Sequence, residues 1–96
     1  MGKYRVKFED KPTNYDYEAR TAREALLGMA HHVGRSGTAY GRAWEWDGRN
    51  FKPVGADPGF GGQSDGVWVL NVPSPPSPQP NARLVADYAK GDFFQD

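Results

Sequence analysis

Residues 22–33, AREALLGMAHHV, constrain the fold more than any other part of the chain, because they carry an apolar stripe with helical spacing. The stripe lies on one helix face and consists of Ala22, Ala25, Leu26, Met29, Ala30 and Val33. Thr21 and Glu24 have the spacing of a capping box, and Gly34 is suited to end the helix. We therefore predict one amphipathic helix that packs on one face of a sheet.

The residues before this helix show the alternation of β-strands. In residues 3–9, Tyr4, Val6 and Phe8 alternate with charged residues, and residues 15–19 alternate in the same way. The turn-forming segment DKPTN lies between the two. We predict an antiparallel hairpin whose outer face pairs Lys and Arg with Asp and Glu.

The residues after the helix predict three more strands and a tail. Residues 42–54 read as a second hairpin that turns at Asp47-Gly48. Residues 67–72, VWVLNV, are apolar enough for a central strand that is covered on both faces. The prolines of residues 73–80 favour an extended spacer, and residues 81–91, NARLVADYAKG, have the pattern of a short helix.

Together these elements predict an α+β fold in the order β-β-α-β-β-β-α. An antiparallel sheet of about five short strands carries the main helix on one face, and a Pro-rich spacer leads to a small C-terminal helix. We assign residues 1–72 to a single α+β domain and residues 73–80 to the spacer. Residues 81–96 form a short helix and tail that dock in cis or in trans.

Trp44 and Trp46 share one face of their strand, because side chains two residues apart in a strand point to the same side. Burying an indole contributes about 2–3 kcal/mol, and a chain of 96 residues has few other sources of that size. We therefore expect the pair to face the core. In the alternative, the two indoles lie on the surface between Arg42 and Arg49 and contact a partner.

Composition limits the classes of function. The formal net charge is zero, so no field of one sign steers the whole molecule toward nucleic acid or membrane. The absence of cysteine excludes disulfides, thiol catalysis and Cys-ligated zinc. No apolar run has the length of a membrane span, and no signal-peptide pattern is present. We predict a cytoplasmic protein that does not bind membranes.

No motif predicts catalysis or a metal. His31 and His32 are adjacent, so on a helix they point about 100° apart and do not chelate one metal ion. Asp57 and Asp65 lack the further oxygen ligands of a calcium-binding loop. The glycines near Arg35 match neither a P-loop nor a dinucleotide fingerprint. We predict no enzymatic activity, no cofactor and no metal.

The aromatic and basic residues instead predict binding. We expect a small non-enzymatic protein-binding module, because Trp, Tyr and Arg dominate protein hot spots. The predicted binding residues are Arg35, Tyr40, Arg42, Trp44, Trp46 and Arg49, and the predicted tail-docking residues are Leu84, Tyr88, Phe93 and Phe94. The alternative is a small nucleic-acid-binding protein that uses the basic and aromatic segment 35–49.

The small size and the lack of an active-site signature are similar to those of accessory proteins from phages and mobile elements, many of which bind and block a host protein. We accordingly expect an inhibitor whose partner is another protein. A homodimer formed through the C-terminal tail is compatible with this hypothesis.

Overall fold

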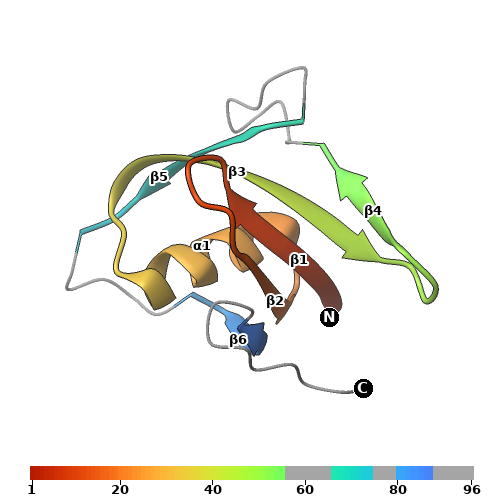
Figure 1. Cartoon of the computed structure of the whole chain (residues 1–96). Coiled ribbons are helices and arrows are strands. Elements are labelled where there is room, and N and C mark those ends of the chain that lie inside the picture. The colour runs from red at the N-terminus through yellow and green to blue at the C-terminus, as the bar shows by residue number, and fades with distance from the viewer. Residues whose placement is uncertain (56–65, 75–79, 88–96) are drawn as a thin grey trace.

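The computed structural model describes residues 1–55, 66–74 and 80–87, and these residues form one helix packed on an antiparallel sheet of six strands (Figure 1). In chain order the elements are β1 (Gly2–Phe8), β2 (Asn14–Ala19), α1 (Ala22–Val33), β3 (Gly37–Trp46), β4 (Phe51–Val54), β5 (Trp68–Val72) and β6 (Ala82–Asp87). The strands follow the order β4-β3-β1-β2-β6, and β5 pairs with β3. The predicted α+β class is confirmed, with six strands in place of about five.

The helix α1 has the ends that the sequence predicts. The Thr21 side chain accepts a hydrogen bond from the Glu24 backbone N–H at 3.2 Å, and Gly34 follows the last turn with a φ of 75°. Only glycine takes up this left-handed conformation without strain. Among the described residues, no helix has the length and apolar character needed to cross a membrane.

β3 is the longest strand, and two different strands pair with the same edge of it. Its first half, 37–41, pairs with β5, and its second half, 43–46, pairs with β4. The β3–β4 hairpin extends past α1 on one side of the molecule (Figure 1). The other edge of β3 pairs with β1, which places the two N-terminal strands at the centre of the sheet.

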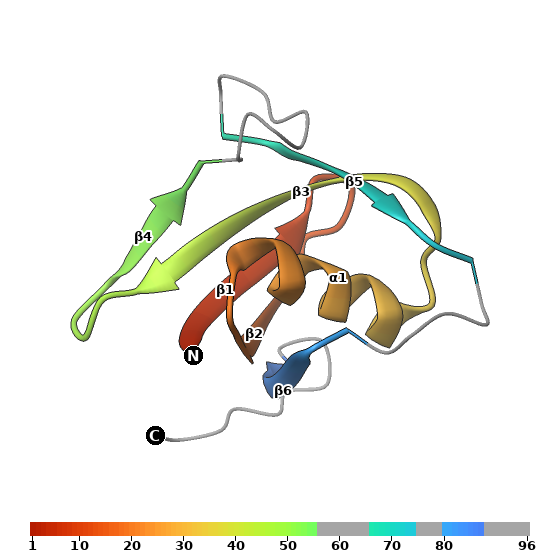
Figure 2. The same ribbon diagram turned by 180° about the vertical axis from the view of Figure 1, so that it is seen from behind.

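The core lies between α1 and the sheet. Figure 2 shows α1 in front of β1 and β2, with β5 and β6 on either side of the helix. The largest fully buried side chains are Val6, Phe8, Leu26, Met29 and Leu70. They come from β1, α1 and β5, so one apolar layer joins segments that are far apart in the sequence.

The prediction of a C-terminal helix is wrong for residues 82–87, the part of that segment in which the structure assigns an element. Residues 82–87 form β6, which pairs antiparallel with β2 and carries a bulge opposite Asp16 and Tyr17. The helical pattern of this segment is short, and an isolated helix of that length is marginal. The unpaired edge of β2 offers a full ladder of backbone hydrogen bonds instead, so tertiary pairing overrides the local preference.

The prediction of a central strand at 67–72 is also corrected. Among the described strands, β5 pairs with β3 alone. Its side chains alternate: Trp68 and Leu70 are buried, Val69 is half-buried, and Asn71 is exposed. The continuous apolar run therefore covers the core from one side only.

Candidate functional site

The close approach of α1 decides which side chains of β3 face the core. Gly41 and Ala43 are buried beneath the helix, and Leu26 Cδ2 lies 3.0 Å from where a Cβ atom on Gly41 would be. No large side chain fits there. Trp44 and Trp46 occupy the opposite face of β3, and Trp46 is 37% exposed. The expectation that both indoles face the core is therefore wrong.

Trp68 on β5 takes the core position that the sequence assigned to the other two tryptophans. It is 5% exposed and belongs to the apolar cluster beneath α1. Its Nε1–H donates a hydrogen bond to the Val54 carbonyl oxygen at 3.0 Å, so the buried indole keeps a partner for its polar group. The three tryptophans are thus divided between the two faces of the sheet.

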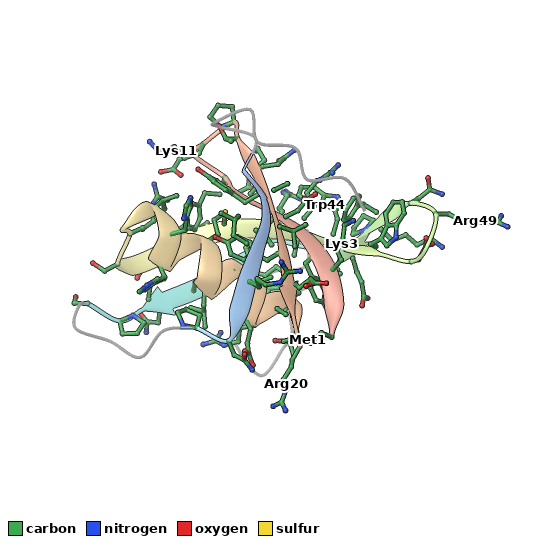
Figure 3. The ribbon with its side chains drawn as sticks, turned by 90° about the horizontal axis from the view of Figure 1, so that it is seen from below. Met1, Lys3, Lys11, Arg20, Trp44 and Arg49 are labelled. Carbon is green, nitrogen blue, oxygen red and sulfur yellow. The ribbon has the colours of Figure 1, made fainter. Side chains whose placement is uncertain are left out.

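We call the sheet face that points away from α1 the open face. Trp44 lies opposite Arg5 in the β1–β3 ladder, and Figure 3 labels Trp44 together with Lys3 of β1. Strand alternation and register give the members of the open face as Lys3, Arg5, Lys7, Asn14, Asp16, Glu18, Thr38, Tyr40, Arg42, Trp44, Trp46, Phe51, Pro53, Val69, Asn71, Arg83 and Ala86. No described helix or strand covers it, so its side chains form a candidate binding surface.

An aromatic cluster occupies the β3–β4 side of the open face. The rings of Trp46 and Phe51 lie opposite one another in the ladder, with centroids 5.0 Å apart and planes inclined at 54°. The Lys3 ammonium lies 5.4 Å from the Trp46 ring centroid, and the Arg5 guanidinium lies 4.1 Å from the Phe51 centroid. Cations at these distances are attracted to the ring faces and fix the rings in place.

Ion pairs lie beside the aromatic cluster and extend across the open face to β6. Arg5 binds Asp16 through two hydrogen bonds of 2.9 and 3.2 Å, and Asp16 is only 3% exposed. This two-pronged geometry is the strongest form of an Arg–carboxylate pair. Arg42 Nε donates to Glu9 Oε1 at 2.7 Å. Farther along, Arg83 of β6 pairs with Glu18 of β2.

The structure brings together four of the six predicted binding residues. Tyr40, Arg42, Trp44 and Trp46 all lie on β3 and on the open face. Tyr40 is 46% exposed, the highest value among the aromatic side chains described. Their alternation along one strand puts Trp44 directly beside Arg5 of β1, and Arg42 directly beside Lys7.

Arg35 lies apart from this group, at the C-terminal end of α1. Its guanidinium donates hydrogen bonds of 2.9 and 3.0 Å to the two carboxylate oxygens of Asp10, and it lies 4.3 Å from the Phe8 ring centroid. The hydrogen bonds from Arg35 hold the pKa of Asp10 below its ordinary value. Arg35 therefore ties the first turn to the helix end.

Arg49 also lies apart, at the tip of the β3–β4 hairpin (Figure 3). Asp47 organises this tip: its Oδ1 accepts hydrogen bonds from the backbone N–H groups of Asn50 and Arg49, both at 2.8 Å. Lys52 approaches its other oxygen at 3.2 Å. These three contacts, the one from Asn50 first, lower the pKa of Asp47 to about 2.

A separate cleft of about 590 Å³ lies at the C-terminal end of α1. Its lining residues are Phe8, Lys11, Thr13, Tyr15, Val33, Gly34, Arg35 and Ser36. His32 packs edge-on against Tyr15 with ring centroids 5.6 Å apart. Two guanidinium nitrogens of Arg35 bind Asp10, and Lys11 supplies a second cation to the lining.

The predicted tail-docking residues fall into two groups. Leu84 lies on β6 and packs against the core cluster in cis. Tyr88, Phe93 and Phe94 lie outside the described residues, as do Asp57 and Asp65. Docking in trans stays a prediction.

Sequence reasoning missed the contribution of β1 and β4 to the open face. The alternation of the sequence predicts that Lys3, Arg5 and Lys7 form the charged side of a strand, and the hairpin pattern includes Phe51. The pairing of β1 with β3, which the sequence did not specify, places the three basic residues beside the tryptophans. The open face can be identified only when the alternation of β1 is considered together with its pairing to β3.

Within residues 1–55, 66–74 and 80–87, no three His, Asp or Glu side chains come together in a way that could hold a metal ion. Comparison of the chain with protein-family models, with curated proteins and with solved structures found no significant match. The geometry of the open face is therefore the basis for a proposed function.

Proposed function

We propose that this protein is a non-enzymatic protein-binding module and that the open face is its binding surface. One observation carries the proposal: Trp44, Trp46, Phe51 and Tyr40 gather on a sheet face that no described helix or strand covers. Aromatic side chains grouped on a surface, with polar groups around them, mark interaction sites. Trp, Tyr and Arg are also the residues that contribute most at protein interfaces.

The fixed geometry of the aromatic cluster supports the same proposal. Trp46 contacts Phe51 on one side and has the Lys3 ammonium near its ring, so its position is set before any partner arrives. A side chain that is already ordered loses little entropy on binding. Such a surface binds a partner by presenting rigid anchors, and its function would be to occlude or bridge that partner.

Nucleic-acid binding is the alternative, and the basic row of Lys3, Arg5 and Lys7 beside the tryptophans favours it. Two observations favour protein over nucleic acid. The ring faces of Trp46 and Phe51 are engaged by each other and by cations, whereas base stacking requires accessible ring faces. In addition, Arg5, Arg42 and Arg83 each pair with a carboxylate, which reduces the charge available to phosphates.

The proposal is tested with two matched variants, Trp46→Ser and Val33→Ser. Both remove a partly exposed apolar side chain, since Trp46 is 37% and Val33 43% exposed, but Val33 lies at the end of α1, away from the open face. The tagged proteins are used to capture partners from a lysate of the organism that carries the gene. A protein retained by the parent chain and by Val33→Ser, and lost with Trp46→Ser, is the expected result.

Two outcomes would contradict the proposal. If all three chains retain the same proteins, the open face takes no part in binding. If the captured material is nucleic acid whose binding falls steeply as salt increases, the alternative is correct. That the captured protein is inhibited is a further prediction, measured by adding the purified module to an assay of that protein.

A further inference from the structure

The cleft at the C-terminal end of α1 lies apart from the open face. Phe8 and Tyr15, two of its lining residues, belong to or pack against the core cluster on the helix side of the sheet. Figure 3 shows Lys11 at the β1–β2 turn, far from Arg49 at the tip of the β3–β4 hairpin. The cleft volume of about 590 Å³ falls within the range of small-molecule sites, about 300–1,000 Å³. Its size therefore fits a small molecule, and binding of a protein by the open face does not account for it.

The residues described along this cleft carry an excess of positive charge. They include two cations, Lys11 and Arg35, and no carboxylate. The carboxylate of Asp10 pairs with Arg35 outside the lining, and its side chain is 63% exposed. Within residues 1–55, 66–74 and 80–87, no carboxylate forms an ion pair with Lys11. Hydrogen bonds from Arg35 lower the pKa of Asp10 most, and the charge of Lys11 lowers it least. The cleft therefore has charge that a negatively charged ligand can complement.

Arg35 is held in position before any ligand binds. Its two terminal nitrogens each donate one hydrogen bond to Asp10, at 2.9 and 3.0 Å, and its guanidinium lies 4.3 Å from the Phe8 ring centroid. A guanidinium has more N–H groups than these bonds use, so Nε–H and one N–H of each terminal nitrogen lie beyond the Asp10 contact. A carboxylate that approaches from the cleft can accept hydrogen bonds from these groups, in the planar geometry that arginine favours.

The end of α1 does not cancel this positive charge. The last turn of a helix carries about half a negative charge on its unpaired carbonyl groups. Here the Gly34 N–H already donates to the His31 carbonyl oxygen at 3.2 Å. In the same way, the Arg35 N–H donates to the Ala30 carbonyl oxygen at 2.9 Å. The two cations of the lining exceed the carboxylate of Asp10 by a full charge, so the local balance stays positive.

Apolar groups complete the lining of the cleft. Val33 belongs to the apolar stripe of α1, yet it is 43% exposed. Tyr15 is half-buried, and Phe8 is almost fully buried. Thr13 and Ser36 add hydroxyl groups that donate or accept hydrogen bonds. A ligand that fits this lining has an apolar part as well as an anionic group, because covering Val33 removes apolar surface from water.

We propose that this cleft binds a small organic anion that combines one carboxylate with an aromatic ring. The carboxylate binds Lys11 and the N–H groups of Arg35 that lie beyond the Asp10 contact. The ring packs on Val33 and Tyr15, where aromatic contacts are favourable. The inference goes beyond the proposed function, because the cleft is formed at the end of α1 and on the helix side of the sheet rather than on the open face. The two sites can therefore be tested separately.

The test uses three small probes added to the isotope-labelled full chain. Phenylacetate has the ring and the carboxylate, phenylacetamide has the same ring without the charge, and acetate has the charge without the ring. Binding is followed by NMR shifts of the backbone amides of Lys11, Thr13, Gly34 and Ser36. Nuclear Overhauser contacts between the phenyl protons and the Val33 methyl groups locate the ring.

We expect phenylacetate to shift these amides at a lower concentration than either of the other probes. Lys11→Met should weaken its binding by about fivefold, the effect of one exposed charge contact, and should leave the weaker binding of phenylacetamide unchanged. Lys52→Met, the same substitution on the β3–β4 hairpin, should alter neither. Both lysines are exposed, so both variants should unfold at the same urea concentration as the parent chain.

The apolar part of the site is tested in the same way. Val33→Ser removes methyl groups that the ring covers, so phenylacetate and phenylacetamide should both bind about threefold more weakly. Acetate, which has no ring, should be unaffected. Trp46→Ser changes the open face alone and should leave the binding of every probe unaltered.

Several results would overturn the inference. Equal binding of phenylacetamide and phenylacetate, or unaltered binding of phenylacetate to Lys11→Met, would show that the cations play no part. Equal binding of acetate and phenylacetate would show that the ring contributes nothing. If no probe shifts these amides, the cleft is not a site of this class. None of these results bears on the proposed function, because capture of a protein partner with and without Trp46→Ser tests the open face independently.

Discussion

The two faces of the sheet use aromatic side chains in different ways. Beneath α1, Phe8 and Trp68 lie among aliphatic residues and are almost fully buried. On the open face, Trp46 and Phe51 lie among charged residues and remain partly exposed. The first arrangement is driven by removal of apolar surface from water, whereas the second is held by cation–ring and ion-pair contacts. We infer that the first face serves stability and the second serves recognition.

The largest expected difference in stability is between two tryptophan-to-alanine substitutions, one on each face of the sheet. Trp68→Ala removes a buried indole and its hydrogen bond to Val54, and should lower the free energy of unfolding by about 3–5 kcal/mol. Trp46→Ala should cost about 1 kcal/mol, mainly the ring contact with Phe51. Urea denaturation of both variants measures the difference. Equal losses would mean that the two faces contribute alike to stability.

A second comparison concerns the ion pairs of the open face. Arg5→Met leaves the carboxylate of Asp16, 3% exposed, without its main partner, and should cost about 1–3 kcal/mol. Arg83→Met breaks an exposed pair with Glu18 and should cost less than about 1 kcal/mol. Thermal unfolding of the two variants separates these values. A small effect of Arg5→Met would show that Asp16 finds another partner.

The contact between α1 and β6 gives a third, smaller effect. A Cβ atom on Gly28 would lie 2.8 Å from Ala82 Cβ and 3.2 Å from the Tyr17 ring. Overpacking of this kind costs about 1–3 kcal/mol, while replacing a helical glycine with alanine gains about 1 kcal/mol. Gly28→Ala should therefore destabilise the protein by about 1 kcal/mol in denaturation experiments. Adding Ala82→Gly should restore part of the loss, and no recovery would show that the strain lies elsewhere.

The smallest expected effect on stability comes from the protonation of Asp47, at the tip of the β3–β4 hairpin. The pKa of Asp47 is about 2 in the folded protein, against an ordinary value of 3.8, because its carboxylate accepts hydrogen bonds from Asn50 and Arg49. A lowered pKa contributes stability above the ordinary pKa, and this contribution is lost as the pH falls from about 4 to about 2. NMR titration of the carboxyl carbon should show a midpoint near the lower value. A midpoint close to 3.8 would show that these contacts do not form in solution.

Local patterns in the sequence predicted the helix well. The capping residue Thr21, the apolar stripe and Gly34 lie within one segment, so its bounds depend on neighbouring residues alone. The side of β3 that faces the core depends instead on how closely α1 approaches Gly41, which is set by tertiary packing. For the same reason the sequence identified Trp44 and Trp46 as a pair but placed them on the wrong face.

The strand β6 shows the same limit more strongly. Residues 82–87 have a weak helical pattern, and their strand conformation comes from the ladder with β2, which lies more than half the chain away. The candidate site is affected in a similar way, because Lys3 and Lys7 join the tryptophans only through the pairing of β1 with β3. Patterns among neighbouring residues predict most of the helix and strands, whereas the residues of the open face come together through pairing between strands that are distant in the sequence.

The pairing of β6 with β2 also has a consequence for biosynthesis. Chains fold as they emerge from the ribosome, N-terminal segments first, so β2 loses its open edge only after residues 82–87 have been synthesised. Until then its backbone N–H and C=O groups can pair with another nascent chain. Asp16 and Glu18 on β2 oppose this, because two β2 edges that meet bring acidic side chains together. The same carboxylates that hold the arginines of the finished open face would thus protect the unfinished chain from aggregation.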